Sequence, residues 1–86
     1  MRYALALEYV RLDKPKDAIA LLEEVLKQNA DYLPSYYQLG KLYEKSSRHA
    51  DALKIYADGM RVARQQKDLH TLSELQGAYE MMSGEE

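Results

Sequence analysis

Residues 36–56 contain the stretch that decides the fold, Tyr36-x2-Leu39-Gly40-x2-Tyr43 followed by Ala52-x3-Tyr56. Its large side chains recur at the spacing of one helical face, so both halves of the stretch predict helices with an apolar stripe. Gly40 and Ala52 are small where the two helices cross, and the large residues fill the space beside that crossing. We therefore expect an antiparallel helical hairpin with a close approach at its centre.

The same spacing recurs at a period of 34 residues. A shift of 34 places identical residues opposite one another: Tyr3 and Tyr37, Leu5 and Leu39, Tyr9 and Tyr43, Asp17 and Asp51, Ala18 and Ala52. A third copy, Leu72-x2-Leu75-Gln76-x2-Tyr79, fits at a shift of 36, so we expect two extra residues in the turn around residues 65–68. A fixed period of this length is the signature of a stacked helical repeat.

Five segments carry helical periodicity, at about residues 2–12, 16–29, 34–45, 50–66 and 69–82. Pro34 suits the first turn of the third helix, Asp68 can cap the fifth, and residues 83–86 are expected to form a frayed tail. Ala and Leu together number 23 and Val and Ile only 5, a balance that favours helix over sheet. The length of 86 residues allows one small domain, which we expect to be all-α.

This pattern resembles the tetratricopeptide repeat, W-x2-L-G-x2-Y followed by A-x3-F, with Tyr36 at the Trp position and Tyr56 at the Phe position. In the first unit Arg2 occupies the Trp position, which fits a first repeat. The usual junction proline is replaced by Ala30 and Arg64, a departure that affects the turns. The resemblance implies a right-handed α-α superhelix over residues 1–82: one repeat at about 1–32, a second at about 33–68 and a capping helix at 69–82.

The resemblance also implies a site, because in this family the first helix of each hairpin lines a concave surface on which peptides lie. Carrying the motif across gives these candidate peptide-binding residues: Tyr3, Leu7, Tyr37, Gln38, Lys41, Glu44, Ser73 and Glu74. Tyrosine offers flat apolar area with a hydroxyl tip. Two alternatives stay open, that Tyr3 and Tyr37 pack sideways against neighbouring helices, and that Lys41 is an ordinary solvated lysine.

The groups that carry most enzymatic chemistry are missing from the sequence. Cysteine is absent, and the two histidines, His49 and His70, belong to no metal-binding pair. There is no glycine-rich phosphate loop and no nucleophile elbow. We therefore expect no enzyme, no cofactor and no metal.

Charge argues against nucleic acid and membrane partners. The chain has 12 basic and 14 acidic residues, and it contains no apolar run of the ~20 residues that span a bilayer. Residues 45–67 hold six basic and two acidic side chains, and we interpret Arg61 and Arg64 there as complements to a helix dipole rather than as an RNA-binding patch. From Asp68 onward there are five acidic residues and no Lys or Arg.

The sequence thus predicts a protein–protein interaction module, bacterial and cytoplasmic, that binds a peptide segment or partner helix. One alternative is a structural protein that forms a homodimer by end-to-end stacking, since the first hairpin has no polar cap and leaves Leu7 and Val10 to be covered. Another is a fragment of a longer repeat array.

Overall fold

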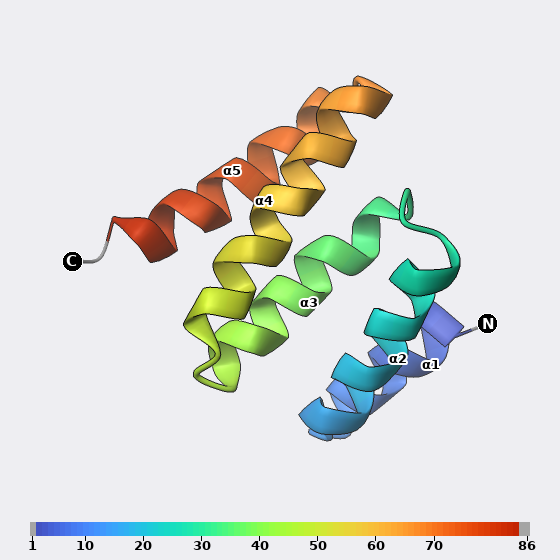
Figure 1. Ribbon diagram of the computed structural model, residues 1–86. Helices are drawn as coiled ribbons and strands as arrows, with labels where there is room; N and C mark the ends of the chain where they lie inside the picture. The colour runs from blue at the N-terminus through green and yellow to red at the C-terminus, as the bar shows by residue number, and fades with distance from the viewer. Residues whose placement is uncertain (1, 85–86) are drawn as a thin grey trace.

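In the computed structural model, which describes residues 2–84, the chain forms five α-helices (Figure 1). They are α1 (Arg2–Arg11), α2 (Pro15–Gln28), α3 (Leu33–Lys45), α4 (His49–Gln66) and α5 (Leu69–Ser83). This confirms the all-α prediction, and every helix end lies within one residue of the expected position. Ser83 belongs to α5 rather than to the expected tail, whereas Met1, Glu85 and Glu86 lie outside the described residues.

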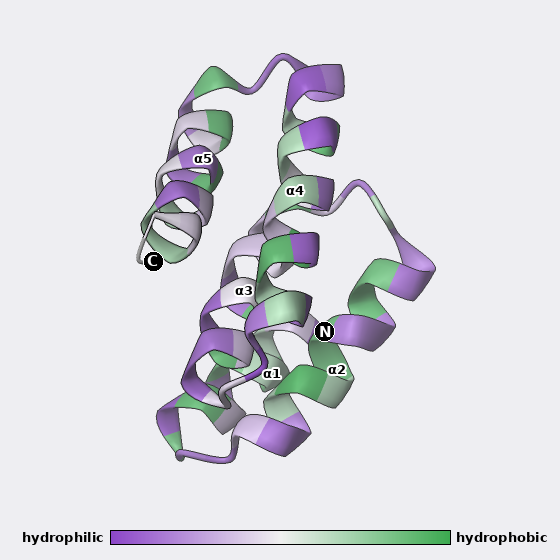
Figure 2. Ribbon diagram, turned by 60° about the vertical axis from the view of Figure 1, so that its left-hand side comes forward, coloured by the Kyte–Doolittle hydropathy of each residue, from purple (hydrophilic) through white to green (hydrophobic). Residues whose placement is uncertain are grey.

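Each helix packs against the next one along the chain. α1 and α2 form one hairpin, α3 and α4 form a second, and α5 lies along α4, with the start of α1 and the end of α5 on opposite sides of the molecule (Figure 1). The shortest dimension is 18 Å, against 31 and 28 Å for the other two, which fits two layers of helices. Hydrophobic and hydrophilic segments alternate along the helices, as amphipathic packing requires (Figure 2).

The turns inside the two hairpins lie one sequence period apart and share the same backbone geometry. Asp13 and Ser47, 34 residues apart, both adopt left-handed conformations, with φ of 59° and 61°. In each turn the following N–H donates to the carbonyl five residues earlier, from Lys14 to Tyr9 and from Arg48 to Tyr43, at 2.8 Å. This bond closes a Schellman motif, which satisfies a free carbonyl at the helix end.

The two extra residues of the second unit lie in a helix and not in a turn, contrary to the sequence prediction. α4 has 18 residues where α2 has 14, and only Lys67 and Asp68 connect it to α5. After α2, Asn29 adopts an extended conformation and ends the helix. Arg64 and the two glutamines after it continue α4 until Lys67 turns left-handed at φ 59°. The insertion therefore lengthens α4 rather than loosening its connection.

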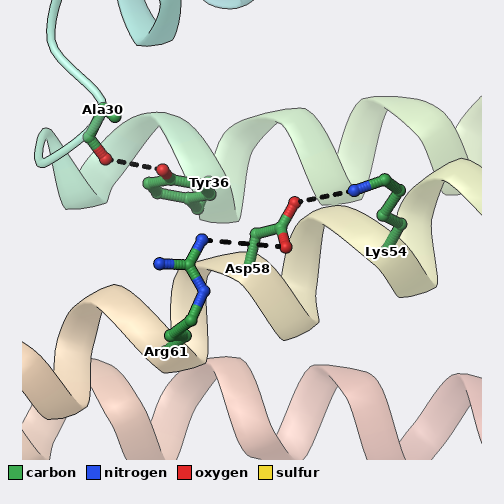
Figure 3. Close-up of polar contacts among 5 residues, drawn as sticks. All are labelled: Ala30, Tyr36, Lys54, Asp58 and Arg61. Atoms are coloured by element: carbon green, nitrogen blue, oxygen red, sulfur yellow. Dashed lines mark hydrogen bonds and ion pairs between the residues drawn. The ribbon is translucent and has the colours of Figure 1, made fainter.

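The junction between the hairpins is held by Tyr36, which is buried in the core. Its hydroxyl donates to the Ala30 carbonyl at 2.5 Å, at the position where the repeat pattern expects a proline (Figure 3). On α4, Asp58 forms ion pairs with Lys54 at 3.3 Å and Arg61 at 3.9 Å. Burial raises the pKa of the Tyr36 phenol, and the Asp58 carboxylate adds to this rise. A side-chain hydrogen bond thus fixes a turn that lacks the proline.

Glycines set the distances at which the helices cross. A Cβ on Gly40 would overlap the fully buried ring of Tyr56, so α3 and α4 approach closely there. A Cβ on Gly59 would lie 2.7 Å from Tyr36 Cβ, so Gly59, which the sequence pattern did not single out, has the same role. At Gly77 a Cβ would meet nothing within 4 Å.

We predict opposite effects for two Gly→Ala substitutions. Gly40→Ala should lower the free energy of unfolding by about 1–3 kcal/mol, because the added methyl group overpacks a rigid core. Gly77→Ala should raise it by up to about 1 kcal/mol, because alanine favours helix and the position is open. Urea unfolding followed by circular dichroism measures both, and changes of the same sign would contradict this account of the crossing.

Candidate functional site

The candidate site is built on a stripe of α3 that lies beside its core stripe. The core stripe of α3 includes Tyr36, Leu39 and Tyr43, all buried. Tyr37 and Lys41 lie one turn apart on another side of the helix, and both remain partly or largely exposed. The same 3.6-residue period that directs one stripe into the core therefore directs a second stripe outward.

Two pockets lie along this second stripe. The first, which we call the Met81 pocket, has a volume of about 520 Å³ and lies between α3 and α5. It is lined by Tyr37, Lys41, Ser73, Glu74, Gly77, Ala78, Glu80 and Met81. The second, the Tyr3 pocket, has a volume of about 280 Å³ and is lined by Tyr3, Leu33, Pro34, Tyr37, Gln38, Asp68, Thr71 and Glu74. Because the pockets share Tyr37 and Glu74, we refer to them together as the groove.

Most of the residues predicted from sequence lie in the groove. Six of the eight line one or both pockets: Tyr3, Tyr37, Gln38, Lys41, Ser73 and Glu74. Leu7 is 37% exposed but lines neither pocket. Glu44 also lies outside their lining, because its carboxylate accepts a hydrogen bond from the Tyr56 hydroxyl at 2.5 Å.

Tyr37 combines the two roles that the sequence left as alternatives. Its ring lies 6.5 Å from the Tyr56 ring and packs against the core, yet it also lines both pockets. The Lys41 ammonium lies over the same ring, 5.3 Å from its centroid, and 3.9 Å from the Glu44 carboxylate. The aromatic ring of the groove is therefore seated on the core and already contacts one cation.

Tyr3 is also held by an aromatic neighbour. Its ring meets that of Tyr32 edge to face, with centroids 5.1 Å apart. Burial raises the pKa of the Tyr3 phenol, with Tyr32 adding to the rise. Tyr3 further lines a separate pocket of about 370 Å³, which the sequence did not predict, together with Arg2, Val25, Gln28, Asn29 and Tyr32.

The contribution of α5 is larger than the sequence predicted. Met81, 70% exposed, lies one turn beyond Gly77 and completes the Met81 pocket. Continuing the helical spacing from Ser73 and Gly77 would have found Met81. Asp68 was predicted as a helix cap, and its carboxylate accepts hydrogen bonds from the Thr71 N–H at 3.1 Å and hydroxyl at 2.8 Å. These bonds lower the pKa of Asp68 and keep it charged.

Two buried phenols connect neighbouring helices through carboxylates. The Tyr43 hydroxyl donates to Glu23 Oε2 at 2.6 Å, which links α3 to α2, and Tyr56 links α4 to Glu44 of α3. Burial first, and then the bonded carboxylate, raise the pKa of both phenols well above the ordinary value of 10.0. The ionised form of either tyrosine is therefore strongly disfavoured in the folded protein.

Comparison with known proteins agrees with this architecture. A family model described as "Tetratricopeptide repeat" matches residues 9–75. A solution structure of a tetratricopeptide repeat domain protein from Salinibacter ruber is 46% identical, with a TM-score of 0.94, over 99% of this chain and 86% of that one. A crystal structure of such a domain protein from the same organism is also 46% identical, with a TM-score of 0.93, over 99% and 94%. No protein of curated function matches the chain.

Two kinds of feature are absent from residues 2–84. Within that range no helix is both long and apolar enough to cross a membrane. The same residues bring together no group of three or more His, Cys, Asp or Glu side chains suited to a metal ion.

The raised pKa values of Tyr43 and Tyr56 predict alkaline instability. Below about pH 10 their stabilising effect is fully present, and it is lost as pH rises because the unfolded chain ionises first. The free energy of unfolding should fall as pH rises above about 10, by about 1 kcal/mol per pH unit for each phenol. Urea unfolding of the wild type and of a Tyr43→Phe/Tyr56→Phe variant measures this, and equal slopes in the two proteins would contradict it.

Proposed function

The chain belongs to the tetratricopeptide repeat family, and we propose that it is a non-enzymatic interaction module that binds a segment of a partner protein in the groove. The family is a helical repeat scaffold that generally mediates protein–protein interaction. The observation that supports the groove as the site is the pair of pockets joined at Tyr37 and Glu74. The Met81 pocket, at about 520 Å³, has the volume of a typical binding site, and the adjoining Tyr3 pocket, at about 280 Å³, extends it.

The lining of the groove suits a peptide. Tyr3 and Tyr37 present aromatic area that loses little rotamer freedom on binding. Gln38 and Ser73 place an amide and a hydroxyl where a peptide backbone needs partners. Gly77 leaves the α5 backbone uncovered, so a bound chain approaches it closely. Leu7 and Glu44 lie outside the two pockets, so in this proposal they contact only parts of the partner that extend beyond the groove.

A bacterial, cytoplasmic location and the absence of cofactors belong to the same proposal. The solved relatives come from a bacterium, Salinibacter ruber. The partner is a protein or peptide, and neither nucleic acid, membrane nor metal has a part in the proposed binding.

Blocking the groove should abolish partner binding. Gly77→Trp fills the Met81 pocket from an open position, and Tyr37→Ala removes the shared ring, so both should lose proteins that the immobilised wild type retains from a native lysate. Leu69→Ala is the matched control, since Leu69 is 73% exposed and lines neither pocket. Mass spectrometry quantifies the retained proteins, and circular dichroism checks that each variant keeps its helices. Equal retention by wild type and Gly77→Trp would refute the site.

A second candidate function, self-association, is favoured by one observation. Leu5 and Leu12 of the first hairpin are 47% and 48% exposed and lie seven residues apart, the spacing of one helical face, which we call the leucine face. Contact with the same face of a second copy would remove these leucines from water.

Sedimentation equilibrium tests this second candidate. If the leucine face pairs, the wild type should be dimeric at ~100 μM and a Leu5→Gln/Leu12→Gln variant monomeric, because pairing depends on protomer concentration. Leu69→Gln, a change at an exposed leucine of α5, should leave the dimer intact. A monomeric wild type at that concentration would eliminate the candidate.

A further inference from the structure

The groove carries an excess of negative charge. Its lining includes three carboxylates, from Asp68, Glu74 and Glu80, and one cationic side chain, Lys41. The Lys41 ammonium is already engaged, since it lies 3.9 Å from the Glu44 carboxylate and over the Tyr37 ring. From residue 68 to the end of the sequence no Lys or Arg is present to neutralise α5. Three carboxylates therefore remain without a Lys or Arg partner of their own in the groove.

The neighbours of these carboxylates do not replace a cationic partner. Asp68 accepts hydrogen bonds from Thr71, which keeps its carboxylate charged. Glu80 accepts a bond from the neutral Gln76 amide at 3.3 Å. Glu74 lies 3.4 Å from His70 Nε2, an interaction between charges only when the histidine is protonated, and its side chain is 54% exposed. All three groups thus keep their negative charge available to a ligand.

A second, independent observation also indicates a cationic ligand. The Tyr37 ring, which forms a wall of both pockets, already has an ammonium group over its face, that of Lys41. The ring therefore presents its electron-rich face where a positive group can reach it. Carboxylates and an aromatic face together are the groups that bind Lys and Arg side chains best.

We propose that the occupant of the groove is an extended, positively charged protein segment, with Lys or Arg side chains seated against Glu74 and its neighbouring carboxylates. This inference rests on the proposed function, of which it specifies the ligand. Gln38 and Ser73 favour an extended segment, because their polar side chains can bond to backbone N–H and C=O groups. Those groups are unpaired in an extended segment, whereas in a helix they are already bonded to one another.

The two pockets indicate where the cations lie. Glu74 lines both pockets, whereas Asp68 lines only the Tyr3 pocket and Glu80 only the Met81 pocket. The bound segment therefore carries one basic side chain at Glu74, where the two pockets meet, and further basic side chains on either side of it.

Lys41 has a specific part in this proposal. Its charge opposes the incoming cation, and its ammonium occupies one face of the Tyr37 ring. Binding displaces it toward Glu44, with which it already forms an ion pair. Removing the Lys41 charge should therefore strengthen binding of a cationic segment, which is opposite to the effect expected if Lys41 anchors an anionic group.

A display library of short random peptides tests the proposal. It is selected in parallel on the wild type and on Gly77→Trp, and peptides retained only by the wild type are groove ligands. Groove ligands enriched in Lys and Arg support the inference. Groove ligands of neutral or acidic composition would overturn it while leaving the proposed function standing. A selection without groove ligands would contradict both.

Matched variants then measure the contribution of charge. For one selected basic peptide, fluorescence anisotropy should show about five- to tenfold weaker binding to Glu74→Gln and several-fold tighter binding to Lys41→Gln. Asp51→Asn removes an equally exposed carboxylate from α4, outside the groove, and should change affinity less than about twofold. Equal affinities of Glu74→Gln and Asp51→Asn, or weaker binding to Lys41→Gln, would each overturn the inference.

Discussion

The contact between Gly40 and the ring of Tyr56 is the constraint on which the rest of the structure depends. It sets the separation of α3 and α4, because any side chain at residue 40 would occupy the volume of a ring that is fully buried. The Tyr56 hydroxyl then reaches Glu44, so a single side chain fixes both the distance between the two helices and their register. Since α3 contributes to both pockets of the groove, this contact also positions the candidate site.

The capping helix α5 has two functions that place different demands on its residues. Leu75 and Ala78 are buried against α4 and close the stack, while Ser73, Glu74 and Gly77 line the groove. A glycine inside a helix lowers its stability, and at Gly77 no neighbour requires one. Burial thus accounts for Leu75 and Ala78, and the groove gives a reason for Gly77.

Much of the fold could be predicted because each helix boundary carries a local signal. Pro15 and Pro34 lie in the first turns of α2 and α3, and Asp68 caps α5, so these starts depend on residues within a turn. Ser83, by contrast, was assigned to a frayed tail, yet its position one turn after Tyr79 extends α5. The location of the two-residue insertion was missed for a related reason, since the self-comparison counts inserted residues but does not locate them.

The groove was predicted only in part, since its geometry depends on contacts between distant residues. The resemblance to the family motif implied which sides of α1 and α3 bind a peptide, and it brought Tyr3, Tyr37 and Lys41 onto the candidate list. The period is broken before α5, so Asp68 and Met81 were not assigned to the site. Glu44 was predicted as a contact because it lies on the same side of its helix as Tyr37 and Lys41. Its place on the helix does not reveal that the Tyr56 hydroxyl, twelve residues further on, donates a hydrogen bond to its carboxylate.

The use of tyrosine as the sole aromatic residue connects stability with binding. Tyr36, Tyr43 and Tyr56 are buried like phenylalanines, but each donates its hydroxyl to a group outside its own helix. These bonds fix the orientation of the helices more narrowly than apolar packing alone, since a hydrogen bond tolerates little change in distance. Tyr37 lies beside Tyr56 and is held by that framework. The groove is therefore formed without a partner, and the proposed binding requires little ordering of the protein.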